Sequence, residues 1–187
     1  MKIYTHENRK FYALTEKLDE FTPTHKGGII LSPFDELAPT VDLIGEISSP
    51  SGAVKKACAL SRATGGVAIV AAKTSLYSLS HLSAIVAHEG ELLEIADSCT
   101  ALPPFAPSYS VKVLKSGSLK IALLVGDDAF YRPLFLKVAN RCDLIVSLPV
   151  SVCSAQESLV RHYADEANKP VLLHSLACSL FITPNLN

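Results

Sequence analysis

The sequence predicts an α/β protein of stacked layers, and three observations lead to this prediction. Short, continuously apolar runs recur along the 187 residues, segments with helical spacing lie between them, and one stretch in mid-chain has a β-hairpin pattern. Continuous apolarity in a strand indicates that both of its faces are covered, as in a sheet flanked by helices. The alternation of such strands with helices is typical of layered α/β folds.

The predicted elements follow one another in order along the chain. Buried strands are expected at residues 28–32, 66–72, 119–125, 143–148 and 170–174. Helices are expected at residues 8–21, 51–64, 130–140 and 155–168, because apolar side chains recur there three or four positions apart. The runs 83–87 and 91–95, separated by a short turn that contains Gly90, predict an antiparallel hairpin. Prolines at positions 103, 104 and 107 make residues 98–110 a loop that crosses the surface or lines a cleft.

The composition limits the class of partner. With 17 Lys and Arg against 18 Asp and Glu, the chain lacks the positive field that nucleic acids or anionic membranes require. The first residues contain no apolar signal segment and no stretch could span a membrane, so the expected location is the cytoplasm. The length favours one domain, residues 1–187. A charged fraction of only 19% favours association with another subunit.

Metal and cofactor chemistry finds little support in the sequence. The five cysteines are widely spaced and form no Cys-x-x-Cys pair, so neither a zinc site nor a disulfide framework is expected. His174 lies inside an apolar strand and is expected to be a hydrogen-bonded core residue. The sequence motifs of serine hydrolases and of nucleotide-binding loops are absent, and we expect no cofactor.

Two acidic pairs follow predicted strands. Asp127 and Asp128 come directly after the strand 119–125 and Gly126. Active sites of α/β folds gather at the carboxyl ends of strands, so either aspartate is a candidate general base, nucleophile or magnesium ligand. The alternative is that Asp128 caps the next helix or accepts hydrogen bonds from loop amides, while Asp127 is solvated. Asp35 and Glu36 repeat the arrangement after the strand 28–32.

Five stretches, taken in order, resemble the carbon-nitrogen hydrolase, or nitrilase, superfamily. They are GGIILSPFDEL (27–37), LSAIVAHEGELLEIADS (82–98), LKIALLVGDDAFYRPLFLKVANRCDLIVSLPVS (119–151), RHYADEANKPVLL (161–173) and SLFITPN (179–185). The first resembles the family's strand running into Pro-Glu, and the second resembles its hairpin leading to Tyr-x-Lys. The third resembles the Cys-Tyr-Asp region with its following strand. The fourth resembles the Arg-Ala-x-Glu-Asn segment, and the fifth resembles Ser-x-Ile-x-x-Pro-x-Gly.

The resemblance implies a four-layer αββα sandwich with mixed sheets, dimerised through one helical layer. It also implies cleavage of amides or nitriles by a Glu, Lys and Cys triad, in which an activated thiol attacks and the oxyanion is stabilised by positive charge or donors. Because the chain ends soon after Pro184, we expect a sandwich without the C-terminal strands and tail of the family.

Carried over residue by residue, the triad positions fall on side chains that cannot perform these roles. The glutamate position falls on Phe34, the lysine position on Ser98 and the cysteine position on Gly126. A shift of the first match by one or two places would offer Asp35 or Glu36 as base. Cys153, after the strand 143–148, is the best substitute nucleophile.

The sequence therefore favours a nitrilase-fold protein without catalytic activity, which binds a small uncharged ligand or another subunit. A remaining pocket should be bounded by Phe34, Ser98, Gly126 and Asp127. The alternative is a divergent, amidase-like hydrolase of C–N bonds that uses Cys153, Asp127 or Asp128. A third hypothesis is a subunit that pairs with an active homologue.

Overall fold

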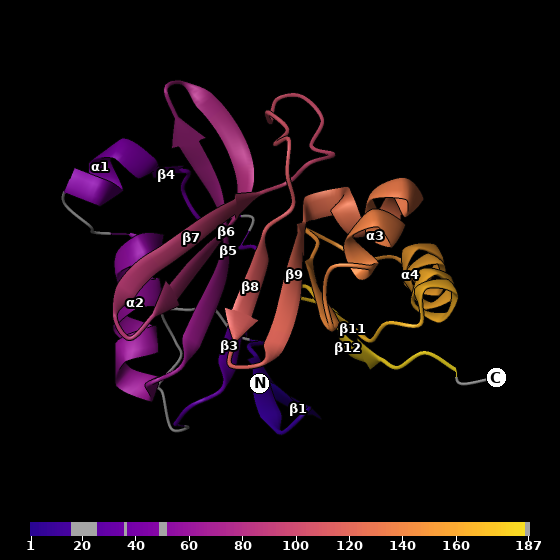
Figure 1. Cartoon of the computed structure of the whole chain (residues 1–187). Helices are drawn as coiled ribbons and strands as arrows, with labels where there is room; N and C mark the ends of the chain where they lie inside the picture. The colour runs from indigo at the N-terminus through magenta and orange to yellow at the C-terminus, as the bar shows by residue number, and fades with distance from the viewer. Residues whose placement is uncertain (16–25, 36, 49–51, 186–187) are drawn as a thin grey trace.

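The computed structural model describes residues 1–15, 26–35, 37–48 and 52–185. Two mixed β-sheets lie face to face at the centre, and helices cover their outer faces (Figure 1). This is the four-layer αββα arrangement that the family resemblance implies, and the strands expected to be buried on both faces occupy its two middle layers. The helix expected at residues 51–64 covers one sheet, and those expected at 130–140 and 155–168 cover the other.

The first sheet contains seven strands within the described residues and runs in the order β1-β2-β3-β5-β6-β7, with β4 paired to β5. These strands are β1 (Lys2–His6), β2 (Arg9–Ala13), β3 (Ile29–Ser32), β4 (Val41–Asp42), β5 (Val67–Leu76), β6 (Leu79–His88) and β7 (Glu91–Asp97). β3 runs parallel to β2 and β5, whereas β5, β6 and β7 form an antiparallel meander. The hairpin predicted from residues 83–95 is confirmed as part of that meander.

The second sheet contains five strands within the described residues, in the order β12-β11-β10-β9-β8. They are β8 (Val113–Ser116), β9 (Leu119–Val125), β10 (Leu144–Leu148), β11 (Val171–His174) and β12 (Ser179–Ile182). β9, β10 and β11 are parallel, so their carboxyl ends meet at one edge of the sheet. The helical segments are α1 (Leu43–Ser48), α2 (Ala53–Thr64), the 3₁₀ turn η2 (Gly126–Phe130), α3 (Arg132–Ala139) and α4 (Ser154–Ala167).

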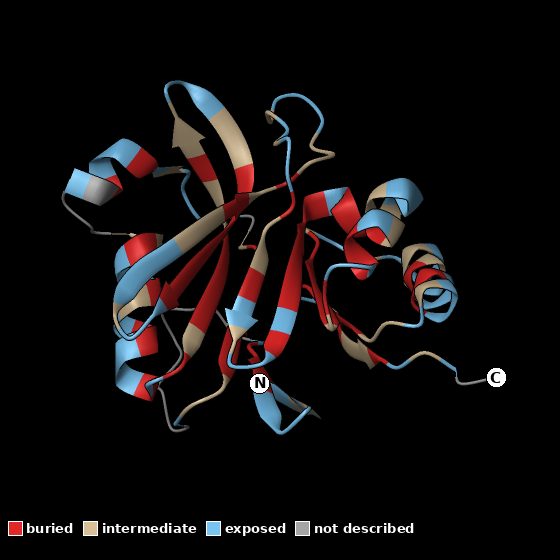
Figure 2. Ribbon diagram, viewed as in Figure 1, coloured by how far each residue is buried: buried red, intermediate tan, exposed pale blue. Residues whose placement is uncertain are grey.

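Alternate residues of each strand contribute to different cores. In β9, Leu123 and Val125 belong to the core between the two sheets, whereas Ala122 and Leu124 face α3 and α4. Side chains of successive residues point to opposite faces of a strand, so a continuously apolar strand must be covered twice. Figure 2 shows the consequence: the central strands are buried along most of their length, and exposed residues lie on the outer surfaces of the helices, at the hairpin tips and on the peripheral strands β1 and β7.

The predicted helix at residues 8–21 is wrong in its described part. Residues 9–13 form β2, which pairs with β1 through a two-residue turn at Glu7 and Asn8, and residues 16–21 lie outside the described residues. Both turn residues have positive φ, 45° and 61°, the conformation of the type I′ hairpin turn. Pairing of β2 with β1 and β3 overrides the weak helical spacing of Leu14 and its neighbours, because tertiary hydrogen bonds outweigh a local pattern.

No helix in the described stretches is both long and apolar enough to cross a membrane. The loop expected at residues 98–110 is confirmed, and it is attached to the β5–β6 hairpin. The amide of Ala106 donates to the carbonyl of Ser80 at 2.7 Å, and the His81 Nδ1 lies 3.0 Å from the Ala106 carbonyl oxygen. Phe105 of the loop forms a parallel bridge with Ser80 of β6, so the loop extends the first sheet near the end of β9, where Gly126 lies.

Candidate functional site

Gly126 stands at the elbow where β9 ends and η2 begins. Its φ is +60°, a backbone conformation that residues with a side chain rarely adopt. A Cβ added there would lie 3.1 Å from Cδ1 of Leu82 and 3.3 Å from Oγ of Ser98, so the elbow is closely packed as well as left-handed. The position that sequence reasoning matched to the family cysteine therefore carries no nucleophile, and its surroundings favour glycine.

Ser98 directly follows β7 and lies against Gly126. Its side chain is fully buried and donates a hydrogen bond to Oδ1 of Asp128 at 2.9 Å. Its amide donates to the carbonyl of Leu82, and its own carbonyl accepts from the amide of Ser108. The structure thus brings together two positions, Ser98 and Gly126, that sequence reasoning matched to the lysine and cysteine of the triad.

Phe34, at the position matched to the glutamate, follows β3 and is only 2% exposed. It belongs to the core between the sheets, the same cluster that contains Leu82. The side chain closest to a Cβ at Gly126 is also that of Leu82, so all three matched positions border one apolar core. An aromatic ring in this environment can fill space and stack on an apolar partner, but it cannot accept a proton.

Asp128 ties the loop after β7 to the elbow after β9. It is 1% exposed and accepts hydrogen bonds from Ser98 Oγ, from the amides of Cys99 and Thr100, from Thr100 Oγ1, and from the amide of Val125, at 2.8–3.3 Å. Two carboxylate oxygens offer about four acceptor positions, so these donors occupy the group. Asp128 is therefore a positioning residue, in agreement with the interpretation that it binds loop amides.

Asp127 differs from its neighbour, because it is exposed on η2. It shares neither the buried donors of Asp128 nor the packed surroundings of Gly126. The adjacent acids thus have different environments: one organises the interior of the site and the other faces solvent. Of the two, Asp127 alone is placed where it can meet a dissolved molecule.

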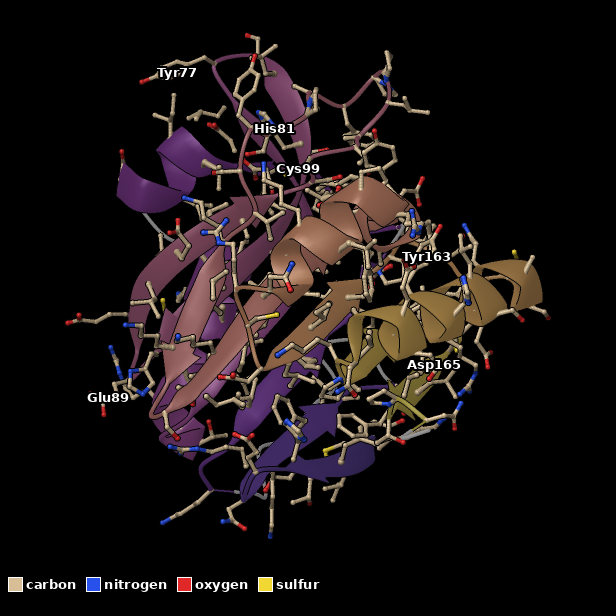
Figure 3. All side chains as sticks on the ribbon, turned by 45° about the vertical axis from the view of Figure 1, so that its right-hand side comes forward. Tyr77, His81, Glu89, Cys99, Tyr163 and Asp165 are labelled. Atoms are coloured by element: carbon tan, nitrogen blue, oxygen red, sulfur yellow. The ribbon has the colours of Figure 1, made fainter. Side chains whose placement is uncertain are left out.

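Burial raises the pKa values of four of the five cysteine thiols. Burial, then Asp128 and Asp97, raise the pKa of the Cys99 thiol to about 11. Burial also raises the pKa values of Cys58, Cys142 and Cys178. A thiol must lose its proton to become a strong nucleophile, so none of these four is activated. Cys99 lies at the end of the molecule from which the β5–β6 hairpin projects, with Tyr77 at its tip (Figure 3).

Cys153 is exposed and stands at the N-cap of α4. Its amide donates to Oε1 of Gln156 at 2.9 Å, which satisfies one of the unpaired donors of the first helical turn. It follows β10, the neighbour of β9, which ends just before Gly126. Further along α4, Tyr163 packs against Phe135 of α3 and Asp165 accepts a hydrogen bond from Asn185, which joins the helix to α3 and to the segment after β12 (Figure 3).

His174, at the end of β11, is fully buried. Its expected place in the core is confirmed, but the expected hydrogen bond is not found, because neither ring nitrogen has a partner of normal geometry in the described part of the chain. Burial lowers the pKa of His174 to about 4, although the backbone of Leu31 and Leu14 opposes this effect. In the described ranges, no group of three or more His, Cys, Asp or Glu side chains is arranged to hold a metal ion.

A surface cavity of about 140 Å³ lies beside the turn after β3. Of the four residues expected to bound a pocket, Phe34 lines this cavity, whereas Ser98, Gly126 and Asp127 do not. The remaining wall comes from the first turn of α2, the middle of β5 and Leu176, which lies between β11 and β12. The cavity was beyond sequence reasoning, because its walls come from segments far apart in the chain.

Comparison with known proteins gives a structural match only. No known protein-family model matches the chain, and no curated protein matches it in sequence. Among solved structures, an amidase of the nitrilase superfamily from Nesterenkonia AN1, in a cysteine-to-alanine mutant, aligns with a TM-score of 0.66 and 17% identity, over 83% of this chain and 70% of the amidase. The chain has the nitrilase fold.

A second structure agrees with this assignment. It is a mutant of the amidase from Nesterenkonia sp. AN1 with the acetamide moiety of fluoroacetamide added covalently at its active-site cysteine; it has a TM-score of 0.66 and 16% identity, over 83% of this chain and 69% of that one. The resemblance carried by five short motifs is thus confirmed at the level of the fold.

Proposed function

We propose that this chain is a nitrilase-fold protein that has lost the Glu-Lys-Cys triad and acts without catalysis, by binding a ligand or another subunit. The observation that carries the proposal is the contact between Ser98 and Gly126, where a Cβ at the glycine would lie 3.3 Å from the serine hydroxyl. Two matched positions are adjacent, as a working site would require, but they supply neither a nucleophile nor a cation.

The surrounding hydrogen bonds support the same function. Asp128 gives its acceptor capacity to the loop after β7, and the pKa of the neighbouring Cys99 thiol is raised to about 11. An amidase needs the opposite, a thiol that readily loses its proton next to a base. The network therefore maintains the shape of the elbow without activating a nucleophile.

Ammonia release tests the proposal. Hydrolysis of an amide consumes one water and yields a carboxylate and ammonia, so the purified protein is incubated with a panel of amides and nitriles beside an active amidase of the same fold. We expect no ammonia above the protein-free blank. Release that disappears in Cys153→Ala or Asp127→Ala would contradict the proposal, support the divergent hydrolase and name its working group. Release that both variants retain would also contradict it.

We also propose a homodimer formed through the helical layer of α3 and α4. Tyr131, at the start of α3, is 54% exposed, and Leu134, Leu136 and Leu159 are only partly buried on this layer. Burying this surface in a second copy would remove apolar area from water. Sedimentation equilibrium should give a dimer that Tyr131→Asp weakens, whereas Tyr109→Asp, at an exposed position in the loop 98–110, should leave it unchanged. A native chain that is monomeric at all concentrations contradicts the dimer.

A further inference from the structure

The cavity beside the turn after β3 has walls that are largely apolar. Phe34 lines it together with Val41 of β4, Val70 and Ala72 of β5, and Leu176 from the loop between β11 and β12. Leu176 is 45% exposed, so apolar surface remains in contact with water at this place. Of the helices, α2 contributes its first turn to the wall, with Ala53 and Lys56, and Figure 1 shows this helix on the outer face of the first sheet.

The charged groups around the cavity are already engaged within the protein. Asp35 Oδ1 accepts a hydrogen bond from the amide of Leu37 at 3.0 Å, and Glu46 Oε1 accepts one from the amide of Gly52 at 2.5 Å. Lys56 also has an interaction partner. The lining holds one carboxylate, Asp35, and one ammonium, Lys56, so it presents no net charge, and a charged ligand of either sign would lose its hydration against apolar walls.

The volume sets the size of the occupant. A cavity of about 140 Å³ is close to the volume, about 150 Å³, at which an apolar cavity in another protein binds benzene. A peptide or a nucleotide is far too large for this space. The partly exposed side chains of Val41, Ala72 and Leu176 offer apolar surface against which such a ring can pack.

We infer that this cavity is a binding site for a small, uncharged, apolar molecule of about the size of a single aromatic ring. The site lies between the first turn of α2, the turn after β3 and Leu176, and it includes neither Ser98 nor Gly126. This inference rests on the proposed non-catalytic function in that it names the class of ligand. A titration measures ligand binding, whereas ammonia release measures turnover. Failure of the proposed ligand site is therefore distinguishable from failure of the proposed non-catalytic function.

The test is a titration followed by methyl NMR, with toluene as the probe and benzoate and benzylammonium as its charged counterparts. Toluene should cause saturable shifts of the methyl signals of Val41, Val70 and Leu176, and the two ions should bind at least tenfold more weakly. Absence of saturable shifts at these methyls up to the solubility limit of toluene overturns the site. Binding of either ion as tight as that of toluene overturns the assignment of an uncharged ligand.

Variants locate the ligand. Ala72→Leu places a larger side chain in the cavity and should weaken toluene binding at least tenfold, whereas Ala59→Leu, on an exposed position of α2, should bind toluene as the native chain does. If the Ala72→Leu spectrum shows loss of the fold, Ala53→Leu fills the same cavity from the start of α2. Native affinity in a folded cavity-filling variant contradicts the assigned location.

Discussion

Acid sensitivity through His174 is the prediction that the structure supports in most detail. This imidazole is fully buried, and burial lowers its pKa from 6.5 to about 4. The N-terminal ammonium and Lys2 lower it further, while the backbone of Leu31 and Leu14 acts in the opposite direction. In the folded chain the ring therefore stays neutral at pH values where the unfolded chain has already bound a proton.

The sign and the size follow from proton linkage. Above pH 6.5 both states hold a neutral ring, and this group adds no pH dependence. As the pH falls from 6.5 to about 4, the unfolded chain gains a proton that the folded chain resists, so the free energy of unfolding decreases. The two pKa values differ by about 2.5, and at about 1.36 kcal/mol for each pKa unit the loss sums to about 3 kcal/mol.

Urea denaturation between pH 7.5 and pH 4 measures this loss. His174→Leu removes the titrating ring, so its free energy of unfolding should change by about 3 kcal/mol less over this range than that of the native chain. His162→Leu, at an exposed position of α4, is the matched control and should follow the native curve. The reasoning is refuted if His174→Leu loses as much stability on acidification as the native chain does.

Three further predictions concern the elbow and the thiols. Asp128→Asn leaves several buried donors without an anionic acceptor and should lower the free energy of unfolding, measured in urea, by about 3 kcal/mol. Asp127→Asn, at an exposed position, should change it by less than about 0.5 kcal/mol. Equal effects would contradict the conclusion that Asp128 organises the interior while Asp127 faces solvent. Gly65 has φ +65° with open space around it, so Gly65→Ala should cost about 1 kcal/mol of conformational strain. Gly126→Ala should cost about 2 kcal/mol or more, because the side chain of Leu82 also crowds the added methyl group. Calorimetric melting compares the two variants, and equal losses of stability would contradict the crowding at Gly126. Iodoacetamide should label Cys153 faster than the four cysteines with raised pKa, as mass spectrometry of timed samples can show; faster labelling of any of those four would contradict their protonated state.

Much of the fold could be predicted because its signals are local. The strand at residues 119–125 is apolar at every position but Lys120, and such a pattern requires two covered faces whatever the rest of the chain does. The helix expected at residues 155–168 is α4, which places Val160, Tyr163 and Ala164 on its buried side. The N-terminal hairpin was missed because its strongest signal is a pair of turn residues, and the partner strand that holds it lies further along the chain.

The candidate site was also predictable only in part, because its residue types can be taken from the sequence but its contacts cannot. The identity of the residues at Phe34, Ser98 and Gly126 could be taken from the sequence, together with the fact that none of them can act as base, cation or nucleophile. That Ser98 contacts Gly126 could not, because the two residues follow strands of different sheets. The five donors to Asp128 could not be predicted either, because most of them come from the loop after β7, which lies near Asp128 only in the folded chain.

The alternation of strands and helices, the family resemblance and the chemistry missing from the matched positions can be predicted from residue type and short-range spacing. In contrast, only the folded chain shows that His174 is buried without a partner of normal geometry, that Asp128 accepts hydrogen bonds from loop donors, and that the cavity lies beside Phe34 and away from Gly126. One cause explains all three findings. Burial, hydrogen bonding and empty volume are set by atoms from distant segments, and the periodicity of one segment carries no information about the others.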